Sequence, residues 1–269
     1  MKLTKITSAL TALAVAAVLS TSAHAQTTYN EGDVLLGFEQ SNGSGGFTAN
    51  NYVVDLGAAS QFINATGPLT FNINTTDLTN AFSSTWASNT GNLVAWGVIG
   101  GSDNFSNITI GGDTLKKNTL FLTSDGIAPT TASNANQNNI NNSIQTFALD
   151  FAGQTESSAN AAIIPSNDAS GWTANTPGTA AFASSFAIEQ SATDGPTDST
   201  LSLYQLNNTS STPGATAKDL GTFSLASNGT LTFDTPAAVP EPSSVALGTV
   251  AAALMTVLLV RKKKSQWVK

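Results

Sequence analysis

The sequence predicts a mainly β domain, an antiparallel sheet or sandwich-like arrangement with one or two packed helices. Three observations predict it. Short runs rich in β-branched and aromatic residues are separated by segments rich in Gly, Ser, Asn and Thr. Apolar and polar residues alternate along several of these runs, as they do in half-buried strands. Only two stretches carry apolar residues at helical spacing.

The first expected strands are residues 34–38 and 52–56. They flank a connection rich in Gly, Ser and Asn, which predicts an antiparallel pair. Residues 69–73 alternate Leu, Phe and Ile with Thr and Asn, the pattern of a half-buried strand. Further strands are expected at residues 93–98, 108–110, 119–123 and 201–206.

The clearest hairpin joins residues 222–225 to residues 230–233 around Asn228-Gly229. Asn and Gly adopt a positive φ at little cost, so this dipeptide favours a type I′ turn. The sequence therefore predicts two adjacent antiparallel strands at this end of the domain.

Two helices are expected, at residues 78–86 and 140–151. In the second, Ile140, Ile144, Phe147 and Phe151 recur on one face, with Asn and Gln opposite. Residues 41–46, 130–139 and 207–216 are polar enough to be interpreted as loops.

The amino terminus has the three parts of a secretory signal peptide. Lys2 and Lys5 precede an apolar and small-residue stretch at residues 6–20, and Ala23-His24-Ala25 is a small-x-small cleavage sequence. We expect cleavage after Ala25, which leaves a β-rich acidic ectodomain at residues 26–238.

The carboxyl terminus carries an apolar run at residues 244–260, about 25 Å long as a helix and therefore close to the thickness of a bilayer core. The basic cluster Arg261, Lys262, Lys263 and Lys264 follows it directly. By the positive-inside rule, the segment predicts a single transmembrane helix with its carboxyl end in the cytoplasm. The preceding Pro240-Glu241-Pro242 then lies outside the membrane.

Pro240, Glu241 and Pro242, the apolar run and the basic cluster occupy residues 239–264 in an order that resembles the PEP-CTERM sorting domain of Gram-negative bacteria. The resemblance implies export through the secretion translocon and transient anchoring in the inner membrane. It also implies cleavage by an exosortase, a membrane transpeptidase that recognises the Pro-Glu-Pro motif. The protein then reaches the cell surface or extracellular matrix. These three residues are acted upon and do not catalyse.

The ectodomain is also similar, in its strands beginning Asp33-Val34-Leu35 and Tyr52-Val53-Val54 and in its last hairpin, to ectodomains of other PEP-CTERM proteins. That similarity implies no catalytic residue. The similarity supports an exported β-rich domain, and it gives no information about the chemistry of that domain.

The charge of the ectodomain excludes several classes of partner. Between residues 26 and 240 lie three basic residues and sixteen acidic ones, a formal charge of −13. Such a surface repels nucleic acid and anionic lipid. The chain has no Cys, and its only His, His24, is removed with the signal peptide. Ser-His-Asp and Cys-His catalysis and His or Cys zinc sites are therefore excluded, and we expect no enzyme and no cofactor.

Acidic segments offer a weak case for calcium. Asp103-Asn104, Gly111-Gly112-Asp113 and residues 194–198 supply oxygen ligands, but they match no EF-hand or repeated calcium loop. Asp, Asn and Gly are equally the residues of β-turns, which is the favoured interpretation. We assign no metal site.

The favoured function is that of a non-enzymatic surface or matrix protein associated with exopolysaccharide. The alternative is a polysaccharide-binding, lectin-like module, with Trp172 as a glycan contact; a tryptophan that fills its own domain is the competing interpretation. A carboxylate-dependent glycosidase is the third and least favoured hypothesis. Among sixteen acidic residues some pair of carboxyl groups lies close together by accident, so their number is weak evidence for a glycosidase. No catalytic residue is assigned.

Overall fold

A computed structural model describes residues 25–42, 46–88, 90–91, 93–102, 107–110, 113–115, 117–125, 128–129, 134–169, 171–175, 195–197, 200–207 and 217–236. The chain divides into two compact units, Met1–Thr235 and Pro236–Lys269. Every helix and strand below belongs to the first unit.

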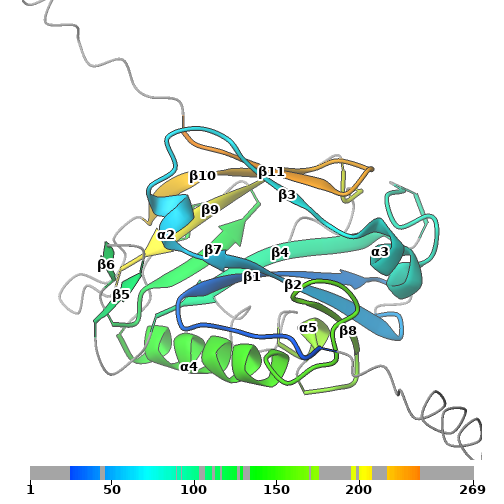
Figure 1. Cartoon of the computed structure of the whole chain (residues 1–269), viewed down its shortest axis with the longest axis horizontal. Coiled ribbons are helices and arrows are strands. Elements are labelled where there is room, and N and C mark those ends of the chain that lie inside the picture. Colours follow the sequence, from blue (N-terminus) through cyan, green and yellow to red (C-terminus); the bar gives the residue numbers. More distant parts are fainter. Residues whose placement is uncertain are drawn as a thin grey trace, which may run out of the picture. The chain divides into compact units, whose positions relative to one another are not determined.

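One large antiparallel sheet dominates the first unit (Figure 1). Its nine strands follow the order β3 (Leu69–Asn72), β11 (Thr230–Asp234), β10 (Lys218–Leu225), β9 (Thr200–Leu206), β7 (Leu120–Ser124), β4 (Val94–Gly101), β1 (Asp33–Gln40), β2 (Asn50–Ala58) and β8 (Ala161–Pro165). A separate hairpin pairs β5 (Ile108–Ile110) with β6 (Asp113–Leu115). The helices are α2 (Ser60–Ile63), α3 (Thr75–Phe82), α4 (Asn134–Phe151) and α5 (Trp172–Asn175). The mainly β prediction is confirmed.

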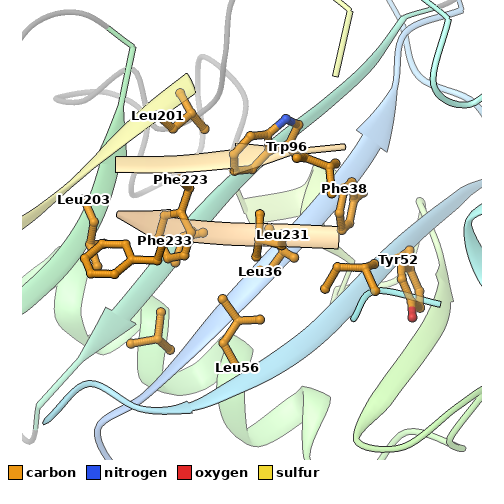
Figure 2. Close-up of a cluster of buried hydrophobic side chains, with 14 of the residues drawn as sticks. Leu36, Phe38, Tyr52, Leu56, Trp96, Leu201, Leu203, Phe223, Leu231 and Phe233 are labelled. Carbon is orange, nitrogen blue, oxygen red and sulfur yellow. The ribbon is translucent and has the colours of Figure 1, made fainter. Parts of the chain in front are cut away.

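The large sheet curls until distant strands share one core, which we call the enclosed core. Side chains of β10 and β11, such as Phe223 and Phe233, belong to the same buried cluster as Leu36 of β1 and Leu56 of β2 (Figure 2). These strands are far apart in the sheet order, so only a curled sheet brings them together. A single curled sheet therefore takes the place of two stacked sheets.

Helix α2 lies between β2 and β3 in the chain and helps to close the curl. Phe62 of α2 contacts Phe71 of β3 at 5.8 Å between ring centroids, Phe223 at 5.6 Å and Phe233 at 5.1 Å. One buried ring thus joins three strands of the rolled end of the sheet.

A second cluster, the outer core, covers the opposite face of β1, β2 and β4. Leu35, Val53 and Ile99 of the sheet pack with residues of α4 and α5. Figure 1 shows both helices on the side of these strands that faces away from β10 and β11. Because β1 has a core on each side, all eight of its residues are buried.

The sequence predicts most strands but misses short elements. All nine expected strands are present, with ends shifted by up to four residues. β6, β8, α2 and α5 are not predicted, because each is short or lacks alternation. The expected helix at 78–86 is α3, which begins after the capping residue Asn74 and ends at Ser83, whose φ of 87° breaks the helix.

Helix α4 begins earlier than predicted. The expected loop at residues 130–139 is wrong from Asn134 onward, and the helix runs for 18 residues. The first two turns of the helix consist mainly of polar residues, so apolar residues do not recur there at helical spacing. Their helical state depends on contacts that a local pattern does not contain.

The predicted type I′ turn at Asn228-Gly229 is also wrong, although the hairpin itself is confirmed. Gly229 has a φ of 82°, whereas Asn228 is not among the residues with positive φ. The Gly229 N–H donates to Ala226 O at 2.9 Å, and the Ala226 N–H donates to Thr230 O. These contacts define a type I turn followed by a glycine bulge, the common three-residue hairpin loop.

Among the described residues, no helix is both long and apolar enough to cross a membrane. The predicted signal peptide up to residue 24 and the predicted sorting signal at 239–264 lie outside the described residues.

Candidate functional site

Two strands of the sheet contain the same bulged motif, Asp-Leu-Gly. In β2, the Gly57 N–H donates to Asp55 Oδ1 at 2.7 Å, and Gly57 has a φ of 86°. In β10, the Gly221 N–H donates to Asp219 Oδ1 at 2.9 Å, and Gly221 has a φ of 145°. The strand register shifts at both places. A bulge of this kind changes the direction in which nearby side chains point.

The first motif places Asp55 against Asp33 of the neighbouring strand β1, and we call these two residues the acidic pair. Asp33 is 5% exposed, and its side chain lies close enough to that of Asp55 to raise the pKa of Asp55. Burial, and to a smaller extent the nearby Asp33, raise the pKa of Asp55 from its ordinary 3.8 to about 6. The Gly57 N–H and the Asn160 amide act in the opposite direction. By contrast, Asp219 of the second motif is exposed.

The N-terminal strap, residues 25–30, crosses the domain beside the acidic pair. Gln26 forms an isolated antiparallel bridge with Thr155. The Thr27 N–H donates to Gln154 O at 3.0 Å, and the Glu156 N–H donates to Ala25 O at 2.9 Å. The Thr27 hydroxyl also donates to Phe151 O at the end of α4. The strap is therefore fastened along the segment that follows α4.

Asn160 connects the strap to the acidic pair. Its Nδ2 donates to Asp55 Oδ2 at 2.8 Å, and its Oδ1 accepts from the Thr28 N–H at 2.9 Å. Its own N–H donates to Glu156 Oε1 at 3.0 Å, while its carbonyl accepts from the Asp55 N–H at 3.1 Å. A φ of 48° at Asn160 makes this set of contacts geometrically available, and Asn tolerates that conformation better than most residues.

Asp33 holds the strap by a second route. Its Oδ2 accepts from the Asn30 N–H at 2.9 Å and from Asn30 Nδ2 at 3.1 Å. Between these two anchors lies Tyr29, which packs on the outer core. Burial raises the pKa of the Tyr29 hydroxyl, and the charges of Asp33 and Asp55 raise it further, so the tyrosine stays neutral.

The carboxyl group of Asp55 keeps its proton to a higher pH than an exposed aspartate does, since its pKa is about 6. Two adjacent carboxyl groups share one proton readily, since two negative charges in contact repel each other. Among the described residues, no group of three or more His, Cys, Asp or Glu is placed to hold a metal ion. Amide and backbone donors occupy both oxygens of Asp55.

Trp172 does not lie where the glycan-contact prediction requires. It is fully buried in α5, and its indole covers Gly37 of β1 so closely that a Cβ at Gly37 would fall 1.8 Å from Trp172 Cε3. Its ring centroid is 5.9 Å from that of Phe147 on α4. Burial of Trp172 confirms the favoured interpretation, a tryptophan that fills its own domain, and the alternative of a glycan contact at this residue is wrong. Trp96 of β4 is also buried, in the enclosed core.

Several other predicted sites lie outside the described residues. They comprise Ala23 of the cleavage sequence, Pro240, Glu241, Pro242, the basic cluster 261–264 and most of the calcium candidates. Of the residues described, Ala25 lies at the start of the strap and Asp113 begins β6. These predictions remain predictions.

Sequence analysis does not single out Asp33, Asp55 or Asn160. One signal was available, namely the occurrence of Asp-Leu-Gly at both 55–57 and 219–221. The partner of each motif comes from a different part of the chain, and this long-range information is absent from a local pattern.

No family model matches this chain, and neither a curated protein nor a solved structure matches it.

Proposed function

We propose that the protein is an exported, non-enzymatic component of the cell surface or extracellular matrix, sorted by its carboxyl-terminal signal and cleaved there by an exosortase. The order of Pro240-Glu241-Pro242, the apolar run and the basic cluster is the observation that carries the proposal. The translocon, the exosortase and the membrane are its partners during export, and exopolysaccharide surrounds it afterwards.

The ectodomain supports a structural role. It has two hydrophobic cores on the two faces of one sheet, and no cysteine to staple it. The acidic pair argues against the glycosidase alternative at that place. Glycosidases separate their two carboxyl groups by about 5 Å or more, to leave room for the sugar or water, whereas the side chains of Asp33 and Asp55 interact directly.

Mass spectrometry of the protein recovered from its native host tests the sorting signal. We expect the mature chain to start at Gln26 and to end close to Pro240-Glu241-Pro242. Replacing these three residues with Ala should leave the precursor in the membrane. A mature chain that ends at Lys269, or unchanged release of the variant, contradicts the proposal.

A second candidate function, polysaccharide binding, is favoured by the outer surface of four strands. On β3, β11, β10 and β9, apolar side chains point into the enclosed core and alternate with polar ones outside. Thr70, Thr232, Ser224 and Thr200 lie opposite one another across the four strands. We call this row, together with Thr222, Ser202 and Thr230, the hydroxyl face.

Neighbouring hydroxyls in this row are spaced by the interval between strands, about 4.8 Å. A row of uncharged donors and acceptors suits a neutral, hydroxylated polymer. Protein partners are a poorer fit, since their interfaces centre on buried aromatic or apolar anchors. Because Trp172 is buried, the hydroxyl face replaces it as the candidate glycan contact.

The triple variant Thr70→Val, Thr222→Val, Thr232→Val removes three hydroxyls and keeps the side-chain shape. If the face binds polysaccharide, affinity for a neutral glycan measured by calorimetry falls about tenfold or more, as expected from losing several hydrogen bonds. Thr109→Val with Thr114→Val is the matched control, since these threonines face each other on the separate β5–β6 hairpin. Equal retention of both variants in the exopolysaccharide fraction excludes this candidate.

A further inference from the structure

We propose that the acidic pair and Asn160 form a proton-operated latch on the N-terminal strap, which fastens the strap when Asp55 holds a proton beside Asp33 and loosens it when that proton is lost. This inference is independent of the proposed function. It rests on the contacts of Asp33, Asp55 and Asn160.

The latch has two arms that hold the same strap. Asp33 binds the strap directly through the backbone and side chain of Asn30. Asp55 binds it through Asn160, whose Oδ1 accepts from Thr28. Both arms therefore end on carboxyl groups that interact with each other. A change of charge at the pair acts on both anchors together.

The N–H groups that donate to the acidic pair offset part of its negative charge, but burial and the proximity of the two carboxyl groups outweigh them, since the pKa of Asp55 is raised. The groups that face the pair are Tyr29 from the strap and Glu156, which reaches it through Asn160. Tyr29 is neutral and Glu156 is acidic, so neither side chain supplies a positive charge. Among the described residues, the charged side chain that acts on Asp55 is that of Asp33. When both carboxyl groups are ionised, their repulsion acts in a buried place where solvent screens it weakly.

The sign of the pH dependence follows from the pKa of Asp55, which is about 6 in the folded protein and 3.8 in an exposed chain. Between these two values the folded state keeps a proton that the unfolded or loosened state releases. The stabilising effect of the proton on Asp55 is therefore complete below about pH 4. It is lost as the pH rises through about 6.

Hydrogen–deuterium exchange by mass spectrometry, corrected for the intrinsic pH dependence of exchange, tests the latch in the intact protein. We expect protection of the strap peptide to be about tenfold or more lower at pH 8 than at pH 5, with smaller changes in peptides from β10 and β11. Equal protection at both pH values overturns the proposal.

Asp33→Asn separates the latch from a general acid effect. Asn keeps an acceptor for Asn30 and offers Asp55 an N–H in place of that proton. We therefore expect this variant to protect the strap at pH 8 as well as at pH 5. Asp219→Asn is the matched control, since Asp219 occupies the same bulged motif at an exposed position, and the wild-type difference should persist in it.

A direct titration keeps the test decisive if Asp33→Asn does not fold. Carboxyl ¹³C NMR of the wild-type protein should show a group of the acidic pair titrating near pH 6. If both carboxyl groups titrate below pH 5, the pair holds no proton in the relevant range and the latch is refuted.

Discussion

At the scale of single residues, the contact between Gly37 and Trp172 decides how α5 packs on the sheet. Gly37 lies on strand β1, and Trp172 comes from a four-residue helix far along the chain. The absence of a side chain at Gly37 leaves the indole room to lie against the strand. Sequence alone places Trp172 in a polar segment, where exposure is a reasonable expectation. The missing information is the glycine beneath it, 135 positions earlier in the chain.

Replacing Gly37 with Ala should therefore destabilise the protein strongly. The new Cβ would overlap the indole, and forcing extra atoms into a packed core costs about 1–3 kcal/mol or more in the free energy of unfolding. Urea denaturation followed by circular dichroism measures this loss. Gly67→Ala is the matched control, because a Cβ at Gly67 has no atom within 4 Å.

A double-mutant cycle assigns that cost to the indole. In a Trp172→Ala background the clash is absent, so Gly37→Ala should lower the free energy of unfolding much less than it does in the wild type. An equal cost in both backgrounds would show that β1 itself, and not the contact with α5, rejects a side chain at this position.

At the scale of elements, α4 shows why a helix boundary was mispredicted. Its apolar residues, beginning at Ile140, give the periodic signal, and these residues do lie in the outer core. Two polar side chains of the helix, Gln137 and Asn141, are also buried. Gln137 Nε2 donates to Asn118 O at 3.0 Å and to Leu206 O at 3.1 Å, and Asn141 Nδ2 donates to Ser102 O. These Asn and Gln side chains look like loop residues in the sequence. In the fold they are buried, because their amide groups donate to backbone carbonyls at the ends of strands.

Asn141→Ala should therefore lower the free energy of unfolding more than the replacement of an exposed polar residue does. The change removes a buried donor from Ser102 O, and a buried carbonyl left without its donor costs about 1–3 kcal/mol. Thermal unfolding of the variant should show a lower midpoint. Asn139→Ala, on the exposed side of the same helix, should leave the midpoint nearly unchanged. If both variants behave alike, the polar contacts of α4 contribute nothing specific.

At the scale of the whole first unit, the sequence predicts the β class and the strands but not the curl. Alternation within a strand predicts which side chains are buried, but it does not predict which strands face one another. The curl depends on contacts such as Phe62 with Phe223 and Phe233, between residues more than 150 positions apart. The acidic pair could not be predicted for a related reason. Its two carboxyl groups come close to each other only when β1 pairs with β2 across a bulge.

The two cores share β1, whose residues alternate between them, and this arrangement predicts that the first unit unfolds as one cooperative body. Val34, Leu36 and Phe38 belong to the enclosed core, whereas Leu35 belongs to the outer core. Loss of either core removes half of the burial of the same strand. A lesion on one face should therefore destabilise the other face equally.

Phe62→Ala in the enclosed core and Phe147→Ala in the outer core test this coupling. Each should cost about 3–5 kcal/mol, the usual loss for a buried phenylalanine. In both variants, tryptophan fluorescence and circular dichroism should report a single shared urea midpoint, since a two-state transition gives the same midpoint by every probe. Leu149→Ala, on a side chain of α4 that is 68% exposed, is the control and should shift the midpoint little. Two separate transitions, or a loss of protection confined to the mutated face, would show that the curled sheet holds two independent cores and that β1 transmits nothing between them.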